Sequence, residues 1–273
     1  MSHRDSEYGF APCHSEPPAH VRRDADGHDW QDPDYVEWWI SVVDSDPLRA
    51  LKSEAERGRM VELVRLHADE RGWEAPRFID LGCGWGSLGE ALLTEFPEST
   101  FVGVDLSQAM LDQCRLRLKR FGDRVELVQT DLEEPFRLPS GRGENQAATA
   151  VFASRCLHHL PRRRLVELYV ELGRQLVEGD YFLNLDRAVP ARRAVLADLA
   201  AELGAGRWML ERWAPMWLRN ASLPQQRSML ERAGFRVSIT RHRPPHPKVH
   251  RPWLIQGILA PPASTVEPLE HQQ

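Results

Sequence analysis

The clearest pattern in the chain is a short apolar run that meets a cluster of glycines and then continues at helical spacing. The segment Arg77–Leu93 reads RFIDLGCGWGSLGEALL, with glycines at 82, 84, 86 and 89. Such a pattern predicts a buried strand, a turn that needs positive φ angles, and a helix that carries the chain back. Because glycine lacks a Cβ atom, a ligand can approach this backbone while N–H groups of the helix N-terminus point at it. The segment therefore predicts a cradle for a small molecule.

Strand and helix patterns continue to alternate after this segment. The expected strands are Thr100–Val104, Val125–Val128, Ala148–Ala153, Tyr181–Leu185, Phe235–Thr240 and Trp253–Ala260, and the expected helices are Ser107–Phe121, Arg162–Val177 and Gln225–Ala233. Repeated βα units give a parallel sheet with helices on both faces, and the short loop before the last strand predicts an antiparallel pair. We therefore expect an α/β fold with a doubly wound, mostly parallel seven-stranded sheet, an antiparallel final strand and a helical cap.

The cap is expected from two segments outside this alternation. Residues 34–71 hold a short aromatic-rich segment and a long amphipathic helix, Pro47–Arg71. The inner stripe of that helix is expected at Leu48, Leu51, Ala55, Met60, Leu63, Val64 and His67. Residues 187–220 carry two helical patterns rich in Trp and Met where a further strand is due. The core then spans 72–260 with 187–220 inserted. Residues 1–33 are expected to be a flexible arm, either disordered or ordering over a ligand, and residues 261–273 a disordered tail.

Composition narrows the class of protein without defining a function. The chain is 42% hydrophobic and 27% charged, with a net charge of −5, which is ordinary for a globular protein and gives no reason to expect nucleic-acid binding. No apolar run approaches the ~18–20 residues of a membrane span, and the N-terminus lacks the apolar region of a signal peptide. The four cysteines, at 13, 83, 114 and 156, form no C-x-x-C pair. We expect a cytoplasmic protein with reduced thiols that does not associate with membranes.

The glycine cradle fits a dinucleotide such as NAD, or another nucleotide-like cofactor that carries a ribose. Gly84-x-Gly86-x-x-Gly89 matches the dinucleotide fingerprint, and Asp105, at the end of the second expected strand, suits the ribose hydroxyls of either cofactor. An ordinary glycine turn and an Asp105 that only caps the next helix are the plainer interpretations. The third expected strand is followed by Asp131, which a dinucleotide site does not need.

Taken in order, four motifs resemble those of class I S-adenosylmethionine (SAM)-dependent methyltransferases. They are DLGCGWG (80–86), VGVDLS (102–107), VQTDLEE (128–134) and FASRCLHHL (152–160), within a resemblance that covers roughly residues 60–260. The resemblance implies SAM as cofactor, with its methionine end at the Gly82 backbone, its ribose at Asp105 and its adenine at Asp131. The cofactor-binding residues expected from it are Asp80, Gly82, Cys83, Gly84, Gly86, Asp105, Leu106, Asp131, Leu132 and Ser154. The turn Glu178-Gly179-Asp180 departs from the glycine-rich turn common in this family.

Methyl transfer depends mainly on alignment, and a general base is needed only for an acceptor that arrives protonated. His158 and His159 follow the fourth expected strand and are the candidate bases, or else histidines that pack or order the loop. Arg155 on the same loop is a candidate for binding an acidic group of the substrate, with a salt bridge as the alternative. His242, His246 and His250 have helical spacing, but the prolines among them forbid that helix, so no metal site is expected.

The acceptor is expected to be a small molecule, because a large cap would obstruct a polymer. Its apolar or aromatic pocket is assigned to Tyr35, Trp38, Trp39, Trp213 and Trp217, with Arg155 as a polar group. Specialised metabolism is a setting suggested by fold-level analogy alone. The sequence leaves open a homodimer, a SAM-binding enzyme that does not methylate (a carboxy-SAM synthase or a cyclase), an NAD-dependent oxidoreductase, and a non-enzymatic protein with this fold.

Overall fold

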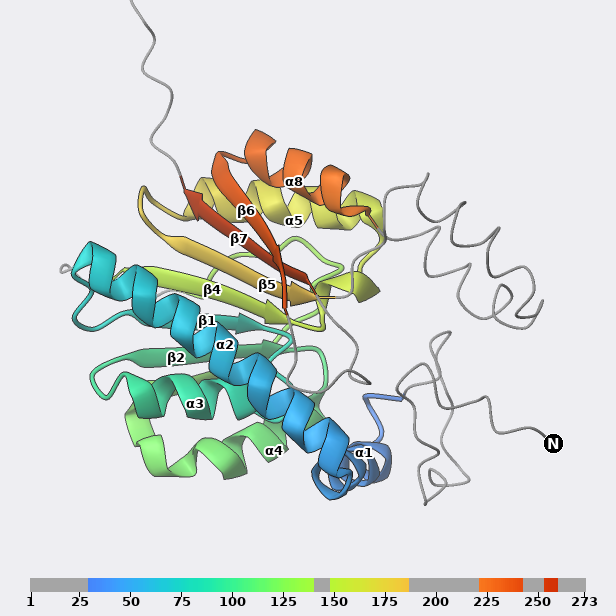
Figure 1. Cartoon of the computed structure of the whole chain (residues 1–273). Helices are drawn as coiled ribbons and strands as arrows, with labels where there is room; N and C mark the ends of the chain where they lie inside the picture. The colour runs from blue at the N-terminus through green and yellow to red at the C-terminus, as the bar shows by residue number, and fades with distance from the viewer. Residues whose placement is uncertain (1–28, 140–147, 187–220, 243–252, 260–273) are drawn as a thin grey trace, which may run out of the picture.

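The computed structural model describes residues 29–139, 148–186, 221–242 and 253–259. The strands are β1 (Arg77–Leu81), β2 (Thr100–Asp105), β3 (Val125–Gln129), β4 (Thr149–Ser154), β5 (Tyr181–Asp186), β6 (Phe235–Arg241) and β7 (Trp253–Leu259). They form one sheet in the order β3-β2-β1-β4-β5-β7-β6 (Figure 1). Strands β1 to β5 pair in parallel, and β7 runs antiparallel to both β5 and β6. The predicted fold class is confirmed.

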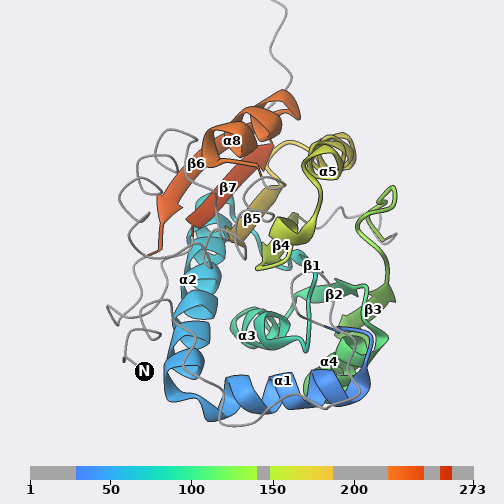
Figure 2. The same ribbon diagram turned by 90° about the vertical axis from the view of Figure 1, so that its right-hand side faces the viewer.

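Helices cover both faces of this sheet (Figures 1 and 2). They are α1 (Pro33–Ser45), α2 (Pro47–Arg71), α3 (Ser87–Glu95), α4 (Gln108–Leu118), α5 (Arg162–Gln175) and α8 (Leu223–Arg232), with short 3-10 helices η1 (Lys119–Arg124) and η2 (Leu157–His159). One core packs α2, α3 and α4 against the sheet, and a second packs α5 and α8 against the opposite face. Because both faces are covered, all five residues of β1 are buried and the strand shows no polar alternation.

Helix α2 begins and ends where the sequence predicts. The Asp46 carboxylate accepts hydrogen bonds from the N–H groups of Leu48 and Arg49, and Gly72 ends the helix at a φ of 66°. The predicted inner stripe is wrong in its first turns, because Leu48 and Leu51 are 41% and 39% exposed. Figure 1 shows the reason: the N-terminal end of α2 extends beyond the strands toward α1.

Helix α1 lies along the end of the helical layer next to α2 and α4 (Figure 2). Asp32 caps it by accepting the Tyr35 N–H at 2.8 Å, and Pro33 occupies the first turn, where no N–H donor is needed. Of the expected N-terminal arm, the structure places residues 29–32 directly before this helix and Pro33 within it. The remainder of that arm, the insertion 187–220 and the tail 261–273 lie outside the described residues.

Two helical glycines offer a matched test of this packing. A Cβ atom on Gly173 of α5 would lie 2.1 Å from the Ala233 carbonyl oxygen, whereas one on Gly58 of α2 would meet nothing within 4 Å. We expect Gly173→Ala to lower the free energy of unfolding by about 1–3 kcal/mol, because backbone cannot yield cheaply. Gly58→Ala should raise it by about 0.5–1 kcal/mol, because alanine is the better helix former. Urea unfolding measures both, and a stable Gly173→Ala protein would contradict the close packing of α5 on α8.

Candidate cofactor and active site

The loop between β1 and α3 is held by β2. The N–H groups of Gly82 and Cys83 both donate to the Val104 carbonyl oxygen, at 2.7 and 3.0 Å. Gly82, Gly84 and Gly86 have φ values of 73°, 52° and 76°, which residues other than glycine rarely adopt. The loop conformation predicted from the glycine pattern is therefore the one that the chain adopts.

Only one of these glycines opens onto free space. A Cβ atom on Gly82 would lie 2.3 Å from Cys156 Sγ, and one on Gly86 would lie 2.5 Å from Cys114 Sγ. A Cβ atom on Gly84 would meet no atom of the described part of the chain within 4 Å. The sequence suggested that all three glycines make room for a ligand. The structure shows that Gly82 and Gly86 make room for cysteine side chains, and that space for a ligand remains at Gly84.

Asp105, the last residue of β2, is bonded to this loop. Its carboxylate accepts the Gly84 N–H and the Ser107 N–H, each at 2.9 Å. Burial raises the pKa of the Asp105 carboxyl, and hydrogen bonds from backbone N–H groups oppose that rise. Each carboxylate oxygen retains a second lone pair, so Asp105 can accept from a ligand hydroxyl pair without leaving the loop.

Asp80 in β1 is a buried carboxyl with an unused acceptor. Its side chain is 2% exposed, and its Oδ1 atom has no hydrogen-bond partner among the described residues. Burial, and then the nearby charge of Asp105, raise the pKa of Asp80 to about 7. A buried acceptor without a donor is costly, and a ligand ammonium would satisfy it. The residues present therefore fit the methionine end and the ribose of SAM.

The sequence-predicted cofactor residues all gather at the carboxyl ends of β1 to β4, on the right-hand edge of the sheet in Figure 1. They are Asp80, Gly82, Cys83, Gly84, Gly86, Asp105, Leu106, Asp131, Leu132 and Ser154. Leu106 is 47% exposed, as expected of an apolar side chain available to a flat ligand, whereas Leu132 is 7% exposed. Parallel strands present their carboxyl ends at one edge, which is where ligands bind such sheets.

His158 forms a pair that the sequence did not predict. Its Nδ1 atom lies 2.6 Å from Asp186 Oδ1, and its backbone N–H donates to Asp186 Oδ2 at 2.9 Å. Asp186 is 2% exposed and is the last residue of β5. The His159 ring packs on His158 with centroids 4.0 Å apart. An acid at the carboxyl end of a predicted parallel strand was the available signal, but the predicted strand ended one residue earlier.

Arg155 is held by a salt bridge. It has a φ of 54°, and its guanidinium pairs with Glu56 of α2, whose side chain is 3% exposed. Of the two roles considered from the sequence, the structure shows the salt bridge. A substrate contact of Arg155 stays a prediction.

The aromatic residues assigned to the acceptor wall form a cluster on α1. The Trp30 ring contacts Tyr35 and Trp39, and Tyr35 contacts Trp38, with centroids 5.3–5.5 Å apart. Tyr35 is buried, and Trp38 and Trp39 are partly exposed. The Trp30 carbonyl accepts the Ser107 hydroxyl, so this cluster lies against the loop that follows Asp105. Trp213 and Trp217 lie outside the described residues.

Within residues 29–139, 148–186, 221–242 and 253–259, no three His, Cys, Asp or Glu side chains gather in a way that could hold a metal ion. Within the same ranges, no helix is both long and apolar enough to cross a membrane.

Part of the chain is similar to known methyltransferases. The family model described as "Methyltransferase domain" matches residues 78–179. Trans-aconitate 2-methyltransferase of Acidovorax ebreus is 41% identical over 93 residues, 33% of each chain. Ribosomal RNA small subunit methyltransferase H of Corynebacterium jeikeium is 36% identical over 107 residues, 35% of this chain and 31% of the relative. Malonyl-[acyl-carrier protein] O-methyltransferase of Chlorobium phaeovibrioides is 30% identical over 143 residues, half of each chain. The similarity thus spans about a third to a half of these relatives.

Solved structures share the fold at low sequence identity. An O-methyltransferase family protein from Burkholderia thailandensis superposes with a TM-score of 0.56 at 19% identity, covering 84% of this chain and 60% of that one. Magnesium protoporphyrin IX methyltransferase from Synechocystis, solved with bound S-adenosylhomocysteine, gives 0.55 at 14% identity, covering 79% and 88%. Residues 78–179 thus match a methyltransferase domain, and the described core has the Rossmann-like fold of solved methyltransferases.

The raised pKa of Asp80 predicts a pH-dependent stability for the ligand-free protein. An unfolded aspartate titrates near 3.9, so the folded state holds its proton more tightly, and the cost of ionising Asp80 accrues as pH rises from ~4 to ~7. Asp80→Asn removes this cost. We compare the free energy of unfolding of the Asp80→Asn variant with that of the unsubstituted protein at each pH. The advantage of the variant should be larger at pH 8 than at pH 5 by roughly 2 kcal/mol. Urea unfolding at both pH values measures this, and equal differences would contradict a buried, unpartnered carboxyl.

Proposed function

We propose that the chain is a SAM-dependent methyltransferase that transfers a methyl group to a small-molecule acceptor. The proposal rests on three features that lie together: the Asp80 acceptor, the open Gly84 backbone and the Asp105 carboxylate. Asp80 suits the ammonium of SAM, and Asp105 suits its ribose. Asp131 and Leu132 supply the expected adenine contacts. SAM supplies a methyl group on a sulfonium, which is a good leaving group, so the protein mainly has to align the acceptor.

His158 is the general base in this proposal. A neutral histidine that donates from Nδ1 to a carboxylate leaves a lone pair on Nε2. The short contact to Asp186 fixes this tautomer and stabilises the imidazolium that forms. Nε2 takes the proton that an acceptor hydroxyl, amine or acid loses as its bond to the methyl carbon forms. The electron pair of the broken sulfur–carbon bond remains on sulfur.

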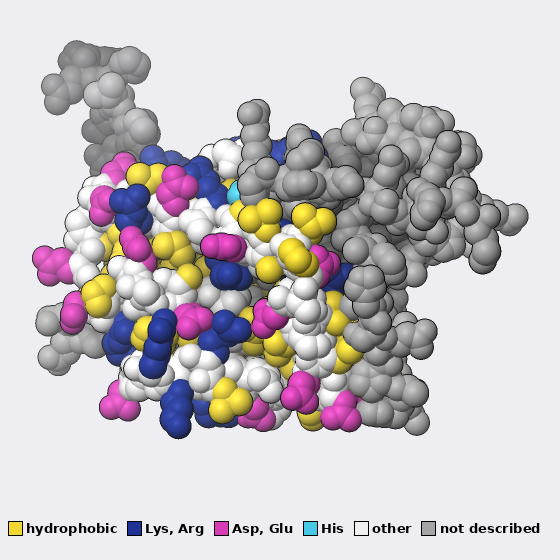
Figure 3. Space-filling view, turned by 60° about the horizontal axis from the view of Figure 1, so that its bottom comes forward, with side chains coloured by type: hydrophobic (Ala, Val, Ile, Leu, Met, Phe, Trp, Pro, Cys, Tyr) yellow, Lys and Arg dark blue, Asp and Glu magenta, His cyan; other side chains and the backbone are white. Residues whose placement is uncertain are grey.

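A small acceptor is supported by the surface and by some relatives. On the face seen in Figure 3, Lys and Arg side chains are mixed with Asp and Glu. Ion pairs such as Arg117–Glu90 and Arg65–Glu95 join side chains of opposite charge. Such a face lacks the continuous positive charge that favours nucleic acid. Trans-aconitate and malonyl-acyl carrier protein are named as acceptors of two relatives, while a third relative is named for ribosomal RNA. The acceptor wall at Tyr35, Trp38, Trp39, Trp213 and Trp217 remains part of this proposal.

Cofactor binding tests the proposal directly. Native mass spectrometry of the purified protein should detect retained SAM or S-adenosylhomocysteine. Asp105→Ala should weaken S-adenosylhomocysteine binding at least about tenfold, because two charge-assisted hydrogen bonds are lost. The control is Asp112→Ala on α4, an exposed acid that, among the described residues, bonds only its helix neighbours Gln108 and Arg115. Calorimetry that shows equal affinity for both folded variants would refute the ribose assignment.

The base assignment predicts a loss confined to turnover. His158→Ala should lower kcat by about 10²–10⁴-fold, with S-adenosylhomocysteine affinity within about twofold. Asp186→Asn should also lower kcat, because an amide does not hold the required tautomer. His159→Ala is the neighbouring control and should change kcat only a few-fold. The assay is release of S-adenosylhomocysteine with an acceptor found by screening, and losses of a few-fold for all three would mean that alignment alone drives transfer.

A further inference from the structure

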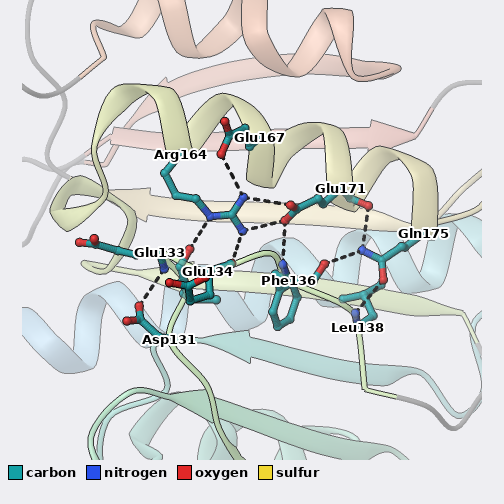
Figure 4. Close-up of polar contacts among 10 residues, drawn as sticks. Asp131, Glu133, Glu134, Phe136, Leu138, Arg164, Glu167, Glu171 and Gln175 are labelled. Carbon is teal, nitrogen blue, oxygen red and sulfur yellow. Dashed lines mark hydrogen bonds and ion pairs between the residues drawn. The ribbon is translucent and has the colours of Figure 1, made fainter.

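Arg164, in the first turn of α5, is a buried arginine that binds the loop after β3 (Figure 4). Its Nε atom donates to the Leu132 carbonyl and its Nη2 atom to the Glu134 carbonyl, both at 2.7 Å. The guanidinium also meets both carboxylate oxygens of Glu171, at 3.0 and 2.7 Å. A buried guanidinium is costly unless its donors are satisfied, and here carbonyls and a carboxylate satisfy them together.

The same face of α5 holds the next part of the loop. Glu171 accepts the Phe136 N–H at 3.0 Å, and Gln175 accepts the Leu138 N–H at 2.8 Å and donates to the Phe136 carbonyl at 3.1 Å. Burial acts to raise the pKa of Glu171, but the hydrogen bonds from Arg164 and from the Phe136 N–H outweigh it and lower that pKa. Three side chains of one helix therefore fix the path of the backbone from residue 132 to residue 138.

One peptide plane links Arg164 to Asp131. The peptide between Leu132 and Glu133 accepts from Arg164 through the Leu132 carbonyl. Through the Glu133 N–H, the same peptide donates to Asp131 Oδ1 at 2.8 Å (Figure 4). Arg164 thus holds one end of this peptide, and the Asp131 carboxylate is bonded to the other. Loss of Arg164 would remove a hydrogen bond that fixes this peptide. The Asp131 carboxylate, which the peptide orients, would then be held less firmly.

We infer that Arg164 is a positioning residue for base recognition, acting through the Leu132–Glu133 peptide to aim the Asp131 carboxylate at the exocyclic amino group of adenine. This inference rests on the proposed SAM function of the site. It predicts that Arg164 controls discrimination between a 6-amino and a 6-oxo purine. A side chain that only stabilised the loop would instead change the affinity for both bases alike.

The experiment compares S-adenosylhomocysteine with S-inosylhomocysteine, its 6-oxo analogue, by calorimetry. The unsubstituted protein should prefer the adenine ligand by about tenfold or more, because a carboxylate accepts from an amino group but not from a carbonyl. In Arg164→Met the preference should fall below about threefold, through weaker binding of the adenine ligand, with the inosine ligand changed by less than about twofold. Arg163→Met is the matched control, since the neighbouring Arg163 side chain is 92% exposed and bonds only Glu167 among the contacts described. It should keep the full preference.

The outcomes separate this inference from the proposed function. Absence of S-adenosylhomocysteine binding to the unsubstituted protein would refute the proposed function itself. Binding with full preference retained in Arg164→Met, or with both ligands weakened equally, would overturn the positioning role alone. If Arg164→Met does not fold, Arg164→Lys takes its place. A lysine keeps the charge but cannot reproduce the planar fork, so the preference should still fall.

Discussion

The cofactor cradle depends on the parallel pairing of β1 with β2. That pairing brings the Val104 carbonyl to the N–H groups of Gly82 and Cys83, and the Asp105 carboxylate to Gly84. Fixing three flexible glycines at positive φ costs conformational entropy, and these hydrogen bonds with the neighbouring strand hold the loop in place. The open backbone at Gly84 is thus a product of the sheet as much as of the glycines.

The site has a consistent electrostatic character. Asp80, Asp105 and Asp186 lie at or next to the carboxyl ends of three strands, and burial followed by these three charges raises the pKa of the Cys156 thiol. A buried edge with several carboxylates favours a cationic ligand, and the proposed cofactor carries both an ammonium and a sulfonium. The same field keeps Cys156 protonated, which suits a packing role beside Gly82.

Strand β5 and helix α5 also support the site. Strand β5 supplies Asp186 to His158, and α5 supplies Arg164 to the loop that carries Asp131. The two elements follow each other in the chain and pack in the same core. The parts proposed for base recognition and for proton transfer are therefore both supported by the α5–β5 unit, whereas the parts for ribose and methionine come from β1 and β2. These two sets of residues meet at the carboxyl edge of the sheet.

The sequence by itself determined the order and type of the elements and the acids at the strand ends. Glycine spacing, apolar runs and helical periodicity are local patterns, and they predicted the sheet and the positive-φ turn between β1 and α3. The cofactor roles of Asp80 and Asp131, drawn from the family resemblance, and that of Asp105 stay predictions. Only the tertiary structure decided which side chains meet. His158 pairs with an acid 28 residues away, and Arg155 with one 99 residues away. In the sequence, Arg164 is one of three consecutive arginines, and no local pattern distinguishes it from the other two. It alone of the three is buried, because α5 packs on the loop after β3. Which residues pair across two elements depends on how the elements pack, and local periodicity in the sequence carries no information about that packing.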